Sequence, residues 1–344
     1  MEPNLHLQVH GTGNAWPVLL GSDHPFYDRT RAADLSNAAY SLYLSQNGQI
    51  LSEVLVDAGH GTMQSLLGGR NRIPECICLT HAHMDHTLSV DWLVQSHRRG
   101  GREDFPYPVY ASQPVFNAFI NSYPHLEKLV KHIRLQFGVT QEMEHAPGFT
   151  ITAYPVYHGP RTPGASMFLF EAARQRILFT GDLLVTLLLK RDLLSLYRPD
   201  LLVSDTNNRF PWPGTNHWSI AGQPGKWRER GAVLEKLIND FGWETIRASF
   251  QEQGQSIEDE PYYAVFMEEE RISEQSYTLI ELLEKLDPMK VMPVHYSGAE
   301  DLKHAGEPVL GRSGMHAWLE NIVRSMDIRS ELIVPESGQI FTFP

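Results

Sequence analysis

Residues 79–87 read LTHAHMDHT and place three histidines and an aspartate within six positions. They follow PECIC, an apolar run that predicts a buried β-strand. Because side chains alternate along an extended backbone, we expect His81, His83 and Asp85 to leave the strand end on one side. A turn into the following helix would bring His86 toward the same space. The stretch therefore predicts a metal site at the end of a strand.

Three more candidate ligands stand at the ends of predicted strands farther along the chain. His158 ends YPVYH, Asp182 ends ILFTGD and His295 ends VMPVH. The combined set of histidines and aspartates is larger than one tetrahedral zinc uses, but it suffices for two ions bridged by a carboxylate and a water. Imidazole and carboxylate without thiolate predict two divalent ions, with zinc favoured and manganese or iron as alternatives.

The remaining sequence alternates between strand-like and helix-like patterns. Asn47-Gly48 between two apolar runs predicts a β-hairpin. The apolar run 183–197 has a helix-like pattern. From about residue 208 the sequence becomes rich in turn formers and then acidic. We interpret residues 208–275 as a mainly helical insertion, either a lid or a dimer surface, within a single domain that covers residues 1–344.

Charge and composition limit the classes of function. Lys and Arg total 29 against 41 Asp and Glu, so the net charge is −12, which would repel a long phosphate backbone. Cys76 and Cys78 fall in a predicted strand, which favours reduced core residues and a cytoplasmic protein over a disulfide or metal role. No stretch approaches the roughly 18 apolar residues of a membrane span, and the N-terminus does not resemble a signal peptide.

The pattern H-x-H-x-D-H, followed by the histidine of YPVYH, the aspartate of TGD and the late VH, resembles the metallo-β-lactamase superfamily of hydrolases. This resemblance covers nearly the whole chain outside residues 208–275 and implies a four-layer αββα sandwich. Asp57 of VDAG resembles a buried position that supports the ligand loop, with a turn-forming aspartate as the alternative. The resemblance also implies the ligand sets, which are His81, His83 and His158 for one metal, Asp85, His86 and His295 for the other, and Asp182 as the bridge.

Two further segments resemble one branch of the superfamily. GTGNAWP, with the later Asn37, is similar to a signature of ribonuclease Z and its phosphodiesterase relatives, although it can also be a simple glycine turn. LLVSDTNNRFPWPGTNHWSI resembles a segment of the phosphoribosyl cyclic phosphodiesterase, which implies catalytic roles for Asp205 and His217. His217 would serve as general acid, oriented by Asp205, and the alternative is a loop histidine that caps a turn. The acidic insertion argues against ribonuclease Z itself, whose relatives hold transfer RNA with a basic arm.

These features predict a binuclear metal-dependent hydrolase of a small cyclic or otherwise compact phosphodiester, which a metal-bridging water would attack as hydroxide. A lactonase or other acyl hydrolase would direct the same hydroxide at a carbonyl. A carrier or scaffold of cofactor biosynthesis is the non-enzymatic alternative. The expected partners are a small-molecule substrate and, as in relatives, a second copy of the chain, whereas neither a long nucleic acid nor a membrane is expected.

Overall fold

The computed structural model describes most of the chain outside the acidic segment. The described residues are 2–102, 105–158, 162–183, 185–206, 248, 251, 276–277, 279–296, 309–325 and 327–343. Nearly all of the predicted insertion, residues 208–275, lies outside them, as does His217, so the predictions made for these residues stay predictions.

The first sheet has seven strands within the described residues. Its first three pairings are antiparallel and its last three are parallel. The predicted hairpin connects β2 (Ala39–Gln46) to β3 (Gln49–Val56). Its turn is formed by Asn47 and Gly48, whose φ angles of 52° and 77° suit a tight turn. In spatial order the strands are β16 (Ile340–Phe343), β1 (Asn4–Gly11), β2 (Ala39–Gln46), β3 (Gln49–Val56), β4 (Cys76–Cys78), β5 (Tyr107–Ala111) and β6 (Val130–Arg134).

The second sheet is also mixed, because antiparallel pairings on one side give way to parallel pairings on the other. A further short strand, β7 (Thr140–Glu142), pairs with β8 off the main path. In spatial order the other strands are β13 (Ser276–Tyr277), β11 (Val185–Leu187), β8 (Thr150–Tyr157), β9 (Ser166–Ala172), β10 (Gln175–Phe179), β12 (Leu201–Asp205), β14 (Lys290–Val294) and β15 (Glu331–Leu332).

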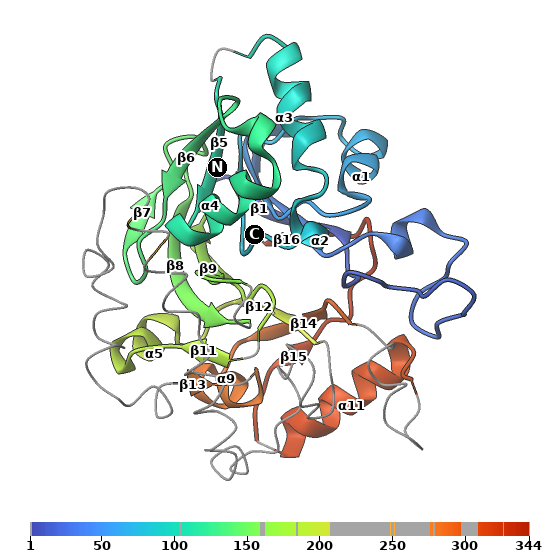
Figure 1. Ribbon diagram of the computed structural model, residues 1–344. Coiled ribbons are helices and arrows are strands. Elements are labelled where there is room, and N and C mark those ends of the chain that lie inside the picture. The colour runs from blue at the N-terminus through green and yellow to red at the C-terminus, as the bar shows by residue number, and fades with distance from the viewer. Residues whose placement is uncertain are drawn as a thin grey trace.

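Helices cover the outer faces of both sheets (Figure 1). Within the described residues, every helix is too short or too polar to cross a membrane. The 3-10 turns are η1 (Ala32–Leu35) and η2 (Pro124–Leu126). The α-helices are α1 (Thr62–Gly68), α2 (Met84–Thr87), α3 (Val90–Arg99), α4 (Gln113–Ser122), α5 (Lys190–Leu196), α9 (Leu279–Leu286) and α11 (Arg312–Ser325).

Two large hydrophobic clusters show the layers. The smaller joins the first sheet to α1, α3 and α4, for example through Ile77, Leu93 and Phe119. The larger fills the space between the sheets and continues to α5 and α9 beyond the second sheet. The order helix, sheet, sheet, helix (Figure 1) confirms the predicted α/β sandwich.

The prediction of one helix-like segment over residues 183–197 was wrong. The segment forms strand β11 first and helix α5 afterwards. Val185 and Thr186 pair with Tyr157 and Val156 of β8, so the edge of the second sheet supplies partners for the apolar residues. A short apolar run is compatible with either a helix or a strand, and here pairing with the sheet decides.

The direction of the strands places the site. β8 and β9 are antiparallel, as are β9 and β10, so β8 runs in the same direction as β10, and β12 and β14 follow that direction. Three predicted ligands, His158, Asp182 and His295, come just after the carboxyl ends of these strands. Carboxyl ends of such strands share one edge of the sheet, which is where open α/β sheets bind ligands.

Candidate metal centre

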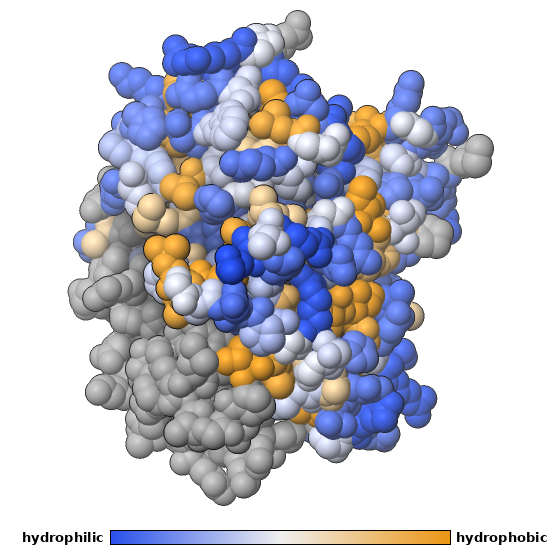
Figure 2. Space-filling view, turned by 90° about the vertical axis from the view of Figure 1, so that its right-hand side faces the viewer, coloured by the Kyte–Doolittle hydropathy of each residue, from blue (hydrophilic) through white to orange (hydrophobic). Residues whose placement is uncertain are grey.

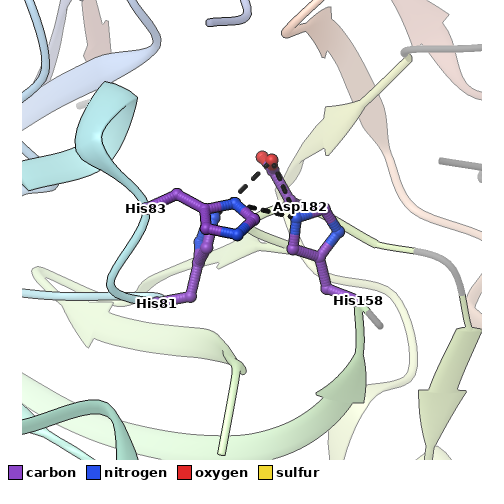
Figure 3. A group of neighbouring side chains, drawn as sticks. All are labelled: His81, His83, His158 and Asp182. Atoms are coloured by element: carbon purple, nitrogen blue, oxygen red, sulfur yellow. Dashed lines mark hydrogen bonds and ion pairs between the residues drawn. The ribbon is translucent and has the colours of Figure 1, made fainter. Parts of the chain in front are cut away.

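Three histidines and one aspartate form a first group of converging side chains (Figure 3). Their donor atoms all lie within 4.8 Å of one another. Nε2 of His158 is 3.3 Å from Nδ1 of His83 and 3.5 Å from Oδ2 of Asp182. Nε2 of His81 is 3.7 Å from the same Oδ2. His158 thus faces one carboxylate oxygen from the end of β8, and His81 faces the same oxygen from the loop after β4.

A second group forms on the other oxygen of the same aspartate. Oδ1 of Asp182 lies 3.3 Å from Nε2 of His86 and 3.3 Å from Nε2 of His295. Oδ2 of Asp85 lies 3.5 Å and 3.4 Å from the same two nitrogens. Asp182 therefore belongs to both groups, with one oxygen turned toward each.

The donor set fits divalent cations. The distances of 3.3–3.7 Å between donor atoms are long for hydrogen bonds. They match the spacing of about 3.4 Å expected between two ligands that each lie about 2.1 Å from one tetrahedral ion. Nε2 of His81 is buried and makes no hydrogen bond within the described residues. A buried nitrogen without a hydrogen bond lowers stability by about 1–3 kcal/mol. An ion bound there would use the lone pair of this nitrogen.

The ligand loop does not follow the strand geometry that the sequence suggested. β4 ends at Cys78, and α2 begins at Met84. His81 and His83 therefore lie in the loop, whereas Asp85 and His86 lie in the first turn of a helix. The expected alternation of side chains along an extended strand was wrong, because the chain turns into α2 before Asp85. Helical geometry, and not strand alternation, brings Asp85 and His86 to the second group.

A buried carboxylate supports the ligands of the first sheet. Asp57 follows β3 and accepts hydrogen bonds from the backbone N–H of Thr80 at 2.9 Å and from its hydroxyl at 2.7 Å. It also accepts one from Nδ1 of His86 at 2.8 Å. Nδ1 of His81 lies 3.1 Å from the Thr80 hydroxyl. We call Asp57, Thr80 and His86 the Asp57 bracket.

A second buried carboxylate has the corresponding position on the second sheet. Asp205, at the end of β12, accepts a hydrogen bond from the backbone N–H of Leu183 at 3.0 Å, next to Asp182. Its Oδ1 lies 3.3 Å from Nδ1 of His295. We call Asp205, Leu183 and His295 the Asp205 bracket. The partner predicted for Asp205, His217, lies outside the described residues.

The comparisons with known proteins agree with this architecture. Residues 52–230, slightly more than half of the chain, match the family model described as "Beta-lactamase superfamily domain". The chain belongs to the metallo-β-lactamase superfamily. No curated protein matches the sequence.

Solved structures of the superfamily share the fold at low sequence identity. A diphosphatase from the PhnP family is 15% identical with a TM-score of 0.56, over 100% of this chain and 98% of that one. Zinc-bound PqqB from Methylobacterium extorquens is 12% identical with a TM-score of 0.54, over 98% of this chain and 99% of that one. The short form of human tRNase Z is 12% identical with a TM-score of 0.52, over 98% of this chain and 99% of that one. At these identities the likeness shows the fold alone.

The electrostatics of the superfamily site favour a cation. Burial alone would lower the pKa of His295, but the charge of Asp182 and contacts with Asp205 and Asp85 raise it to about 10. Burial is also outweighed at His86, where the charges of Asp182 and Asp85 hold the pKa well above its usual value. In the second group the carboxylates therefore dominate the potential and favour positive charge, whereas burial and the neighbouring His86 hold the pKa of His81 well below its usual value.

The structure brings together all seven residues that the resemblance implied as metallo-β-lactamase ligands, and in the same two groups. Their binding of ions stays a prediction. Sequence reasoning missed Thr80 and the contact between Asp205 and His295. The position of Thr80 directly before His81 was a usable signal, because a hydroxyl there can reach the carboxylate after the neighbouring strand. The contact of Asp205 with His295 joins residues 90 positions apart and has no local signal.

Proposed function

We propose that the chain is a binuclear metal-dependent hydrolase, most simply with zinc, that acts on a small cyclic or otherwise compact phosphodiester. The observation that carries the metal site is the sharing of Asp182 between two groups of donor atoms. His81, His83 and His158 would hold one ion with Asp182, and the second group would hold the other. Two divalent ions bound there supply an activated water as nucleophile at neutral pH.

The chain's own residues prepare the imidazoles for this task. Nδ1 of His86 donates to Asp57, and Nδ1 of His295 faces Asp205, so both rings turn Nε2 toward the cluster. A hydrogen bond at one ring nitrogen fixes the tautomer and leaves the lone pair of the other free for a metal. The brackets thus fix which ring nitrogen of His86 and His295 faces the cluster.

The substrate class rests on chemistry and on resemblance. A net charge of −12 disfavours a polynucleotide, whereas a small phosphodiester can be held by local metal charge. The segment from Asp205 to His217 resembles that of a cyclic phosphodiesterase, and one structural neighbour is a diphosphatase. We propose that His217 donates a proton to the leaving oxygen.

Metal analysis and a substrate panel test this proposal. After reconstitution with zinc we expect two equivalents of metal, and turnover of bis(p-nitrophenyl) phosphate or cyclic nucleotides but not of lactones. Asp182→Asn should abolish turnover. His125→Gln is the matched control, because His125 is an exposed histidine paired with Asp91 outside both groups. Turnover of lactones alone would replace the phosphodiesterase with an acyl hydrolase, and fewer than two metals would contradict the binuclear site.

His217→Ala tests the proposed general acid separately. We expect slower turnover of phosphodiesters with poor leaving groups and a smaller effect on p-nitrophenyl esters, because p-nitrophenolate leaves without a proton. If the variant hydrolyses each ester type as fast as the wild type does, His217 has no role in the mechanism. Metal content should be unchanged in this variant.

A second copy of the chain and a cytoplasmic location belong to the same proposal. On the face shown in Figure 2, the described residues form separate hydrophobic patches among hydrophilic ones. A homodimer that used these residues would have a partly polar interface. Sedimentation of the purified chain measures the state directly, and a monomer at all concentrations would contradict the dimer.

A further inference from the structure

A small cavity lies between Asp57, Thr80 and His86 of the first bracket and Asp205 and His295 of the second. Its volume is about 20 Å³, and a buried water needs about 10–15 Å³. Its wall combines polar residues, among them Tyr40, Asp57 and Asp205, with apolar ones such as Val56, Phe179 and Val203. The polar groups allow the cavity to hold a water, since cavities that stay empty are lined by apolar groups.

Tyr40 is the member of this wall that the metal site does not explain. It lies on β2, where its ring packs against Phe179 with the ring centres 5.2 Å apart. The residue is 5% exposed, and its hydroxyl makes no hydrogen bond within the described residues. Buried hydroxyls nearly always have a partner, either protein or ordered water. The hydroxyl therefore needs an acceptor that the surrounding side chains do not supply.

The nearby carboxylates have the capacity to complete such a site. Oδ1 of Asp57 accepts one hydrogen bond, from the N–H of Thr80, and a carboxylate oxygen can accept two. The oxygens of Asp182 face four of the five imidazoles, which leaves Asp57 and Asp205 as the carboxylates set behind the ligands. A water has two hydrogens to donate and can accept from a phenol at the same time.

We propose that this cavity binds one water molecule, which accepts a hydrogen bond from Tyr40 and donates hydrogen bonds to Asp57 and Asp205. The water joins the Asp57 bracket to the Asp205 bracket across the space between the two sheets. Tyr40 is then a positioning residue, because it acts on His86 and His295 through the water and the two carboxylates. The water site itself does not depend on the proposed function, whereas its effect on metal affinity does.

A high-resolution crystal structure of the wild-type chain loaded with zinc tests the water site. We expect one isolated density peak in the cavity, within hydrogen-bond distance of the Tyr40 hydroxyl and of both carboxylates. The same peak should weaken or vanish in Tyr40→Phe. An empty cavity in the wild type would overturn the proposal, whatever the protein does with zinc.

Metal binding tests the positioning role. Tyr40→Phe should weaken zinc affinity about 10-fold, as loss of a residue that supports metal ligands does, and should shift the visible absorption bands of the cobalt-substituted protein. Tyr107→Phe is the matched control: Tyr107 is equally buried, but its hydroxyl donates to the carbonyl of Pro74 at 3.2 Å, outside the cavity wall. The control should lose stability without changing zinc affinity or the cobalt spectrum.

The outcomes separate the two proposals. Wild-type affinity and spectrum in a folded Tyr40→Phe protein would overturn the positioning role. Equal losses of zinc affinity in Tyr40→Phe and Tyr107→Phe would also overturn it, because they would show a general effect of stability. A wild-type protein that binds no zinc but shows the water would contradict the proposed function and leave the water site established.

Discussion

The Asp57 bracket on the first sheet and the Asp205 bracket on the second sheet hold the two halves of the site, one half on each sheet, by the same arrangement but with different strength. Each carboxylate is buried and accepts a hydrogen bond from a backbone N–H next to a ligand. Each also faces a ring nitrogen of another ligand. Asp57 accepts hydrogen bonds of 2.7, 2.8 and 2.9 Å, whereas Asp205 lies 3.0 Å from the N–H of Leu183 and 3.3 Å from Nδ1 of His295.

The two brackets also differ in how the chain closes them. The Asp57 bracket lies within residues 57–86, next to parallel strands β3 and β4. The Asp205 bracket joins residues 183, 205 and 295 across the segment that the sequence suggests as an insertion. Closing a longer stretch of chain costs more conformational entropy. We therefore expect the first bracket to be the more rigid half of the site and the second to depend more on the bound metal.

Asp182→Asn should have the largest effect, because both groups of donor atoms share this residue. An amide cannot offer two anionic oxygens, so affinity in both groups should fall by more than about 100-fold, beyond the loss seen when a mere supporting residue is replaced. Zinc titration should show fewer than one equivalent bound. His158→Gln is the control, because it lies in the first group alone and should leave one equivalent. Two retained equivalents in Asp182→Asn would show that the two groups of donor atoms do not share a ligand.

Asp57→Asn should have the next largest effect. Asp57 has a φ of 56°, a left-handed conformation that asparagine adopts readily, so the variant adds no backbone strain. The amide cannot accept from all three donors, and unmade buried bonds to a charged group should lower the free energy of unfolding by about 2–4 kcal/mol. Zinc affinity of the second group should fall up to about 100-fold. Urea unfolding of the metal-free protein measures the stability. An unchanged midpoint urea concentration would contradict the expectation that the Asp57 bracket is the more rigid one.

Asp205→Asn should have a smaller effect on the metal-free protein. With a contact of 3.3 Å to His295, we expect a loss of about 1–2 kcal/mol in unfolding free energy. The loss of zinc affinity should be about 10-fold, because the variant no longer holds His295 in the tautomer that binds metal. A stability loss larger than that of Asp57→Asn would reverse the ranking of the two brackets. Comparing the unfolding free energies of both variants with and without zinc tests which bracket depends more on the metal.

The same contrast explains what could be predicted from the sequence. The residues of the Asp57 bracket lie close together in the sequence, so H-x-H-x-D-H and VDAG were enough to suggest the ligands of the first sheet and Asp57. Strand-end positions also pointed to His158, Asp182 and His295, since each follows a recognisable apolar strand. The contact between Asp205 and His295 depends on the parallel pairing of β12 with β14, and no local pattern specifies which strands pair.

The backbone conformation of His295 could not be predicted from the sequence either. His295 has a φ of 59°, a left-handed conformation that costs about 1–3 kcal/mol and persists only where the surroundings impose it. A hydrogen bond from its N–H to the carbonyl of Thr12 at 2.8 Å helps to hold this conformation. Thr12 belongs to the opposite sheet's first loop, so the strain at the ligand depends on packing between the two sheets.

The smallest expected effects are those of replacing one threonine beside each bracket carboxylate, Thr80 and Thr180. Thr80 donates its hydroxyl to Asp57, and Thr180 accepts from the backbone N–H of Asp205 at 3.0 Å. Both are buried, and replacement by valine keeps the shape. Each variant should lose about 1 kcal/mol in unfolding free energy.

The two threonine variants should differ in metal affinity. Thr80 also contacts Nδ1 of His81, so Thr80→Val should weaken zinc binding about 10-fold through the first group. The Thr180 hydroxyl contacts backbone groups, the N–H of Asp205 and the carbonyl of Gly181. Thr180→Val should therefore weaken zinc binding much less, although both proteins unfold at similar urea concentrations. Isothermal titration with zinc against a chelator separates the two. Equal zinc affinities would mean that a threonine hydroxyl stabilises the fold of each half without orienting a ligand, and that the strength of the Asp57 bracket comes from its carboxylate alone.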